Sequence, residues 1–159
     1  VGACPKHFAC NSQETNRNKT DSRLSQRALR EIYLKGFEIC VKEAKPYTIM
    51  TSYNKINGVW GHYHYQLCTQ ILRKEWGFNG LVMTDWWMQS SKSPEFPEMK
   101  DNAYRVRAGV DVLMPGGNRA GKRKPDGTLL KTYGKPEGIT LGEMQQTAKR
   151  VIELTMKIN

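Results

Sequence analysis

The sequence predicts an α/β fold of about four βα units with parallel strands, which corresponds to half of a (β/α)8 TIM barrel. Extended and helical patterns alternate along the chain, and the expected strands begin about 30 to 40 residues apart, the size of one βα unit with a functional loop. The 159 residues allow one domain but fall short of the ~250 residues of a closed barrel. Half a barrel has two unpaired strand edges, so we expect further sequence to complete it.

The first unit begins with a strand that ends near Phe8 and continues, after a polar loop, into a long helix. We expect this helix from about Ser25 to Ala44, because Ser25 is a suitable N-cap residue and Pro46 stops the helix. Apolar residues at helical spacing predict its buried face: Leu29, Ile32, Tyr33, Phe37, Cys40 and Val41.

The second and third strands are the clearest extended segments. Residues 47–53 are rich in β-branched and aromatic side chains, and Asn57-Gly58 predicts a turn after them. A helix from about 65 to 76 follows, with Gly77 as a plausible C′ glycine. The third strand, over 80–84, contains the apolar run Leu-Val-Met that is typical of a strand buried on both faces.

The remaining elements complete the pattern. A helix over 100–109 precedes the fourth strand, over 110–114, and a basic segment without periodicity at about 116–138 predicts a long loop. The last helix is expected over about 141–158, with Thr140 and Glu143 as a capping box. Its apolar face would contain Met144, Ala148, Val151, Ile152 and Thr155.

Charge and cysteine content limit the function classes. The formal net charge is +10, and six basic residues lie in the segment at 116–138: Arg119, Lys122, Arg123, Lys124, Lys131 and Lys135. A solvated loop accounts for them; a polyanion-binding patch is the alternative, and no nucleic-acid partner is predicted. The cysteines lack zinc-site spacing, which predicts no metal or cofactor and free, packed thiols that fit a reducing compartment: Cys4, Cys10, Cys40 and Cys68.

Two further expectations come from what the sequence lacks. No stretch approaches the 18 or so apolar residues of a membrane span, so no membrane association is predicted. The chain begins Val1-Gly2-Ala3-Cys4, with neither a methionine nor a leader, and we expect it to be a piece of a longer protein.

Polar side chains gather at the expected carboxyl ends of the strands: Lys6-His7, Thr51 to Asn54, Thr84 to Trp87, and Asp111 with Met114-Pro115. In a parallel barrel these ends meet on the face that carries the catalytic residues. A carboxylate beside aromatic rings, as at Asp85, is how sugar-cleaving sites combine charge with a stacking platform. Asp85 is therefore the catalytic candidate, and a helix N-cap or an ordinary loop carboxylate is the alternative.

Six motifs follow one another in order between Lys6 and about Pro115: Lys6-His7-Phe8, Asn11 to Arg17, Ser25 to Leu34, Met50 to Asn54, Glu75 to Gly80, and Thr84-Asp85-Trp86. Together they resemble glycoside hydrolase family 3, on its β-glucosidase side. The resemblance implies that residues 1–159 are the second half of the N-terminal (β/α)8 barrel domain of that family. It also implies release of terminal β-glucose by a retaining, two-step mechanism.

The resemblance assigns a role to each site residue. Asp85 matches the nucleophile and Trp86 the aromatic floor of the glucose subsite. The other substrate-binding positions match Lys6, His7, Arg17, Met50 and Tyr53. The cations of Lys6 and Arg17 would favour the charged carboxylate, and the Tyr53 hydroxyl would orient one of its oxygens. The structural alternatives are a strand-end role for His7, a core position for Met50 and a surface ion pair for Arg17.

The general acid is missing from the matched motifs. Retaining hydrolysis needs a second carboxyl group about 5 to 5.5 Å from the nucleophile. In the resembled family this group comes from a following α/β sandwich domain, and a sugar-binding Asp and Arg come from the first half of the barrel. The nearest glutamates match no acid position: Glu14, Glu75, Glu95, Glu98 and Glu137. The implied partners are therefore a β-glucoside or oligosaccharide substrate, the missing barrel half and the sandwich domain.

Other activities stay open. The β-N-acetylglucosaminidases of the resembled family carry a histidine and an aspartate where Asn11-Ser12-Gln13 stands here, which favours a β-glucosidase over those enzymes and over β-xylosidases. From a different functional class, the chain could be a sugar-binding or structural fragment without turnover.

Overall fold

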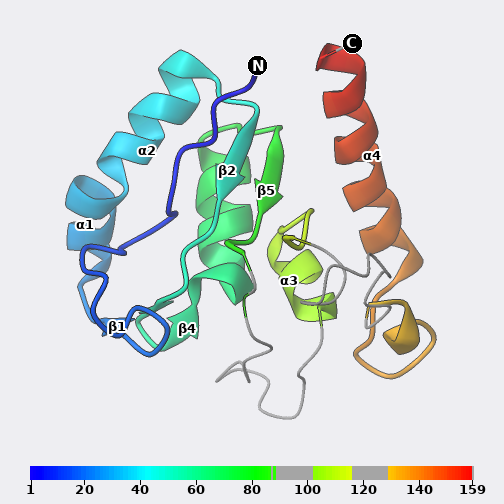
Figure 1. Cartoon of the computed structure of the whole chain (residues 1–159), viewed down its shortest axis with the longest axis horizontal. Helices are drawn as coiled ribbons and strands as arrows, with labels where there is room; N and C mark the ends of the chain where they lie inside the picture. Colours follow the sequence, from blue (N-terminus) through cyan, green and yellow to red (C-terminus); the bar gives the residue numbers. More distant parts are fainter. Residues whose placement is uncertain (87, 89–101, 116–128, 159) are drawn as a thin grey trace.

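The computed structural model describes residues 1–86, 88, 102–115 and 129–158. Its centre is a parallel pair of strands, β2 (Thr48–Met50) and β5 (Leu81–Met83) (Figure 1). Single parallel bridges continue this pair on both sides, Phe8 with Thr51 and Val112 with Met83. The four predicted strands are thus neighbours in chain order and parallel, although the first and fourth contribute bridges rather than full strands.

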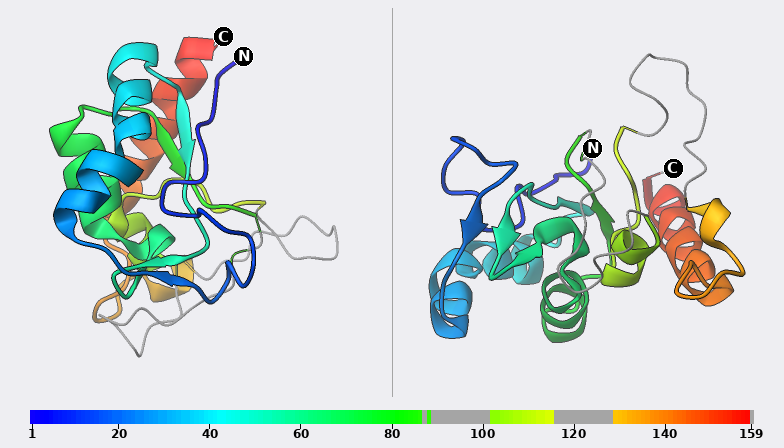
Figure 2. Two further views of the ribbon diagram at one scale, coloured as in Figure 1. Left: turned by 90° about the vertical axis from the view of Figure 1, so that its left-hand side faces the viewer. Right: turned by 90° about the horizontal axis from the view of Figure 1, so that it is seen from below.

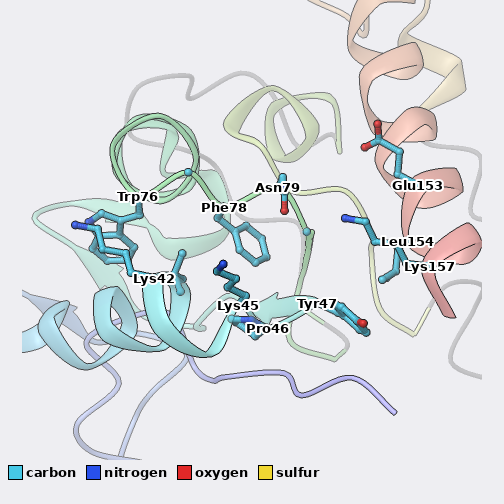
Figure 3. A pocket seen from close by; sticks show the side chains of 13 residues that line it. Lys42, Lys45, Pro46, Tyr47, Trp76, Phe78, Asn79, Glu153, Leu154 and Lys157 are labelled. Carbon is cyan, nitrogen blue, oxygen red and sulfur yellow. The ribbon is translucent and has the colours of Figure 1, made fainter.

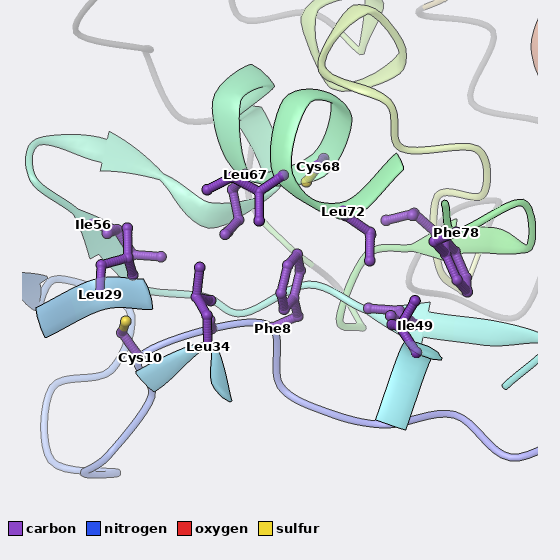
Figure 4. Packing of buried hydrophobic residues seen from close by; sticks show 14 of the residues in the cluster. Phe8, Cys10, Leu29, Leu34, Ile49, Ile56, Leu67, Cys68, Leu72 and Phe78 are labelled. Carbon is purple, nitrogen blue, oxygen red and sulfur yellow. The ribbon is translucent and has the colours of Figure 1, made fainter. Parts of the chain in front are cut away.

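The helices lie on one side of the parallel segments (Figure 2). Between them and the strands is the main hydrophobic cluster, in which the Phe8 ring lies 5.0 Å from that of Phe37 and 6.0 Å from that of Trp76, measured between centroids. Ile49 of β2 and Val82 of β5 belong to the same cluster (Figure 4). Because side chains alternate along a strand, the residues beside these two face away from the helices.

The first predicted helix is present as a run of α1 (Gln26–Ala28), η1 (Leu29–Tyr33), α2 (Lys35–Ile39) and η2 (Cys40–Ala44). Ser25 caps it by accepting a hydrogen bond from the Ala28 N–H. The predicted buried face is wrong at Ile32 and Tyr33, which are exposed, whereas Leu34 is fully buried. In the π-helical turn η1 the Leu34 N–H donates to the Leu29 carbonyl, so the turn contains one extra residue and rotates Leu34 into the core.

A small sheet that the strand pattern did not predict lies beyond β2. Strands β3 (Lys55–Ile56) and β4 (Val59–Trp60) form an antiparallel hairpin, and β1 (Asp21–Ser22) pairs with β3 in parallel. The predicted Asn57-Gly58 turn closes the hairpin with φ angles of 50° and 93°. Both positions need the left-handed region, which Asn and Gly adopt most readily.

The second predicted helix is confirmed as η4 (Gln66–Glu75), which follows the short helix η3 (Gly61–Tyr63). Its apolar side chains at 67, 71 and 72 are buried, and Gly77 has the positive φ of a C′ residue. Its last residue, Glu75, forms an ion pair with Arg30 of the first helix.

The C-terminal part contains α3 (Ala103–Ala108), η5 (Leu130–Thr132) and α4 (Leu141–Ile158). The capping box is confirmed, because the Glu143 N–H donates to Thr140 Oγ1 and the Glu143 carboxylate accepts from the Thr140 N–H. Val151 and Ile152 are exposed, so the predicted apolar face of α4 is not buried there. Residues 116–128 of the predicted basic loop lie outside the described residues; Lys131 and Lys135 are exposed.

The sequence places Asp111 among the polar residues of the catalytic face, and this expectation is wrong. Its side chain is 0% exposed and contacts Arg73 of η4 at 2.6 Å and Arg150 of α4 at 2.8 Å. The Val82 N–H also donates to Asp111 Oδ2. Both arginines come from helices, so the Asp111 carboxylate is directed to the helical layer. Asp111 therefore attaches two helices to the strands.

We predict that Asp111→Asn lowers the free energy of unfolding by about 3 kcal/mol or more, because two partly buried arginines lose their shared carboxylate. Urea denaturation at pH 7 measures the change. Glu153→Gln, which removes the exposed Lys149–Glu153 pair at 3.8 Å, is the control and should change stability by about 0.5 kcal/mol or less. Equal effects of the two substitutions would contradict the anchoring role.

Candidate functional site

Asp85 and His7 form the centre of the candidate site. Asp85 follows β5 and His7 precedes the bridge at Phe8, and the side chains meet with His7 Nε2 3.2 Å from Asp85 Oδ2. The other carboxylate oxygen accepts a hydrogen bond of 2.6 Å from the Trp86 N–H. Among the described residues none donates a well-aligned hydrogen bond to Oδ2. One oxygen of the buried carboxylate is thus held by the backbone, and the other faces the imidazole.

The surroundings of His7 favour the neutral form of its imidazole. Burial lowers the pKa of His7 below its usual 6.5, and this effect exceeds the opposing influence of the Asp85 carboxylate. The positive charges of Lys6 and Arg17 lower it further. A neutral imidazole can donate one N–H while its other nitrogen accepts, so His7 can serve as an uncharged hydrogen-bonding group beside the carboxylate.

Tyr53 reaches the same site from the end of β2, but not as expected. Its hydroxyl donates to the Trp86 carbonyl rather than to the Asp85 carboxylate. Burial raises the pKa of Tyr53, the negative charge of Asp85 raises it further, and Arg17 opposes both. Tyr53 therefore fixes the backbone just after Asp85, and its effect on the carboxylate is indirect.

Arg17 lies against Tyr53, with its guanidinium carbon 4.5 Å from the centre of the tyrosine ring. It also forms an ion pair of 3.1 Å with Glu14. Arg17 thus forms the surface ion pair that was its alternative role. Its cation–π contact with Tyr53 also brings it to the residues around Asp85.

The other three predicted residues are Met50, Trp86 and Lys6. Met50 pairs in register with Met83 and lies on the face of β2 opposite Ile49, away from the helix-side cluster. Trp86 is 42% exposed. Lys6 is exposed, and its charge acts on His7. All seven predicted residues thus belong to the ends of neighbouring parallel segments or to the loop that follows the first of them.

The glutamates considered for the role of the acid each contact another side chain where the structure describes them. Glu75 pairs with Arg30 on the helical side, and Glu137 accepts a hydrogen bond from the Tyr104 hydroxyl. Glu14 pairs with Arg17, while Glu95 and Glu98 lie outside the described residues.

The described residues contain no cluster that could hold a metal ion, and no helix in that part of the chain is long and apolar enough to cross a membrane. The four cysteines are free thiols, as predicted. Burial raises the pKa of Cys10 to about 11 and that of Cys68 to about 12, so both stay protonated and unreactive at neutral pH.

A separate cavity of about 510 Å³ lies at the opposite end of the strands (Figure 3). Its walls come from the residues before β2 and β5, including Tyr47 and Gly80, and from Glu153 and Lys157 of α4. Because Asp85 follows β5 and Gly80 precedes it, this cavity and the candidate site belong to different ends of the sheet.

The family model described as glycosyl hydrolase family 3 N terminal domain matches residues 1–154. The chain belongs to glycosyl hydrolase family 3. It is 43% identical over 152 residues to a beta-glucosidase from Ruminococcus albus, covering 95% of this chain and 16% of that relative. It is 48% identical over 115 residues to an exo-alpha-(1->6)-L-arabinopyranosidase from Bifidobacterium longum, covering 72% of this chain and 14% of the relative.

A solved structure supports the same membership. Beta-glucosidase 3B from Thermotoga neapolitana in complex with glucose superposes with a TM-score of 0.84 at 35% identity, covering 98% of this chain and 21% of that chain. The α/β fold is therefore that of the family's N-terminal domain. This family 3 chain spans about a fifth or less of the length of these relatives.

Contacts around the predicted residues include some that sequence reasoning missed. The sequence names Glu14 only among the glutamates that match no acid position, whereas the structure pairs it with Arg17. No sequence signal pointed to this pair, because a spacing of three residues brings acidic and basic side chains together on a helix and these residues form a loop. The Tyr53 contact with the Trp86 backbone had no sequence signal, since a backbone carbonyl is present at every position.

We predict that the NMR titration midpoint of His7 lies below 6.5 and that Asp85→Asn lowers it further, because the carboxylate charge that favours the imidazolium is then removed. His64, whose pKa burial lowers to about 4, is an internal control that should not change. A His7 midpoint that rises or stays constant in Asp85→Asn would contradict the contact.

Proposed function

We propose that residues 1–159 form the second half of a (β/α)8 barrel in a retaining β-glucosidase, with Asp85 as the covalent nucleophile. The parallel order of the four extended segments and the position of the helices on one side of them support the half barrel. The names of the family 3 relatives support glycoside hydrolysis. On this proposal, Lys6, His7, Arg17, Met50, Tyr53 and Trp86 bind or surround the terminal sugar.

The placement of Asp85 is the observation that carries the proposal. Its carboxylate is buried at the carboxyl end of β5, one oxygen is fixed by the Trp86 N–H, and His7 lies 3.2 Å from the other. The oxygen that attacks the sugar carbon must be free of strong hydrogen bonds. Among the described residues, none donates a well-aligned hydrogen bond to Asp85 Oδ2, so this oxygen meets the requirement. The exposed ring of Trp86, the next residue in the chain, offers an apolar surface for a sugar ring.

In the proposed reaction, Asp85 attacks the anomeric carbon and forms a glycosyl ester while the bond to the leaving-group oxygen breaks. A carboxylic acid donates a proton to that oxygen, and the resulting carboxylate then takes a proton from the water that hydrolyses the ester. On this proposal, His7 and the cations Lys6 and Arg17 hydrogen-bond sugar hydroxyls.

The acid is proposed to lie outside residues 1–159. Glu14, Glu75 and Glu137 are each held by another partner, at Arg17, Arg30 and Tyr104 respectively. Following the resemblance to family 3, we assign the acid to the α/β sandwich domain and the remaining sugar contacts to the first half of the barrel.

A pentopyranosidase is the second candidate function, favoured by the similarity to the arabinopyranosidase from Bifidobacterium longum. Both pentopyranosides lack the exocyclic hydroxymethyl group of glucose, and an α-L-arabinopyranoside also differs from a β-D-glucopyranoside in the configuration at C4. Values of kcat/KM for aryl β-D-glucopyranoside, α-L-arabinopyranoside and β-D-xylopyranoside, measured with the complete enzyme, distinguish a β-glucosidase from an arabinopyranosidase and a β-xylosidase. An aryl β-N-acetylglucosaminide tests for a β-N-acetylglucosaminidase, and turnover of none of these substrates would indicate a sugar-binding protein.

We predict that Asp85→Ala in the complete enzyme lowers kcat by several orders of magnitude without unfolding the protein, because the covalent step is lost. A 2-fluoro glucoside should label the wild-type enzyme on the peptide that contains Asp85, as read by mass spectrometry. Asp21→Asn, which removes a carboxylate of β1 paired with Arg23, is the control and should keep its labelling. Label on any other carboxylate would contradict the assignment.

We also predict that residues 1–159 alone hydrolyse aryl β-glucosides at least about 10²- to 10⁴-fold more slowly than the complete enzyme, because general-acid help is absent. Co-expression with the missing barrel half and sandwich domain should restore turnover. Activity of the isolated chain within tenfold of the complete enzyme would mean that the acid lies within these residues.

A further inference from the structure

The loop that carries Arg17 is closed at its base. It leaves the first parallel segment at Cys10 and returns at β1, where the Ser22 hydroxyl donates to the Cys10 carbonyl at 3.0 Å. On the same side, Ser52 and Asn54 donate to the Ala9 carbonyl. These contacts fix where the loop begins and ends, whereas the direction of the Arg17 side chain depends on its contacts with Glu14 and with the Tyr53 ring.

Glu14 supplies the contacts within the loop. One of its carboxylate oxygens accepts a hydrogen bond of 2.9 Å from the Asn11 side chain, and the other lies 3.1 Å from Arg17 Nη1. Its backbone carbonyl also accepts from the Arg17 N–H at 3.2 Å. Glu14 thus connects the start of the loop to both the backbone and the guanidinium of Arg17.

The second contact of Arg17, with the Tyr53 ring, constrains it less. A ring face attracts a cation over a broad area, so the guanidinium can slide or rotate over Tyr53 without losing that attraction. A carboxylate oxygen at 3.1 Å accepts along a defined direction. In the described part of the chain, Glu14 is the carboxylate within ion-pair distance of Arg17. The side chains of Glu14 and Arg17 are 69% and 33% exposed, so solvent weakens the pair and the expected effect is small.

We infer that Glu14 is a positioning residue that holds Arg17 over Tyr53 in the orientation in which it meets the sugar. Glu14 itself does not touch the substrate or Asp85. The inference rests on the proposed function, because it takes Arg17 to be a sugar-binding residue. It assigns to Glu14 a role that differs from that of a general acid.

The test measures steady-state kinetics of the complete enzyme on an aryl β-glucoside. Glu14→Gln keeps the size of the side chain but removes its charge, and it should raise KM by about two- to fivefold, the range that one exposed ion pair supports, with kcat nearly unchanged. Glu14→Asp retains the charge and should recover part of the loss. The matched control is Glu31→Gln, which breaks the exposed Arg27–Glu31 pair on the first helix and should leave KM unchanged.

A double-mutant cycle separates this inference from the proposed function. Arg17→Ala should raise KM more than Glu14→Gln does, and adding Glu14→Gln to Arg17→Ala should have no further effect. If Arg17→Ala leaves KM unchanged, the proposed sugar-binding role of Arg17 fails, and the inference fails with it. If Arg17→Ala raises KM but Glu14→Gln behaves like Glu31→Gln, or if the two effects multiply in the double variant, only the role of Glu14 is overturned.

Discussion

Parallel hydrogen bonding between four extended segments is the constraint on which the rest of the structure depends. The Ser52 N–H donates to the Phe8 carbonyl, the Thr51 N–H to the Met83 carbonyl and the Thr84 N–H to the Val112 carbonyl. These bonds place the carboxyl ends of the segments at one edge. The alternation of side chains then divides the roles, because Phe8 enters the helix-side core while its neighbour His7 meets Asp85. Packing of Phe8 in the core therefore sets the position of the adjacent residue, His7, at the candidate site.

The two buried aspartates, Asp111 and Asp85, have different charged partners, and this difference fits a structural role for Asp111 and a chemical role for Asp85. Asp111 is surrounded by Arg73 and Arg150 and by a backbone N–H, so both its oxygens are engaged. Asp85 has one engaged oxygen and, beside the other, an imidazole whose surroundings favour its neutral form. A carboxylate held by two arginines is a poor nucleophile and a good anchor, whereas the environment of Asp85 leaves one oxygen available.

The sequence predicts the order of elements better than it predicts which faces are buried and which side chains are in contact. The order of the strands followed from the spacing of βα units. The capping box and the Asn57-Gly58 turn followed from local chemistry, because each depends on residues that are close together in the sequence. The burial of Leu34 in place of Ile32 could not be predicted, since a π-helical turn changes the period of the helix without a sequence signal. The position of Asp111 and the Tyr53 partner depended on tertiary packing. Position at a predicted strand end made Asp85 the catalytic candidate, and motifs of the resembled family suggested the roles of the other candidate residues.

A terminal sugar bound over Asp85, at the carboxyl ends of the parallel segments, is the central claim. A crystal structure of the complete enzyme with bound glucose tests it most directly. We expect the anomeric carbon next to Asp85 Oδ2, sugar hydroxyls hydrogen-bonded to Lys6, His7 and Arg17, and the sugar ring against Trp86. Glucose bound away from Asp85, for example in the cavity between Tyr47 and α4, would contradict the claim.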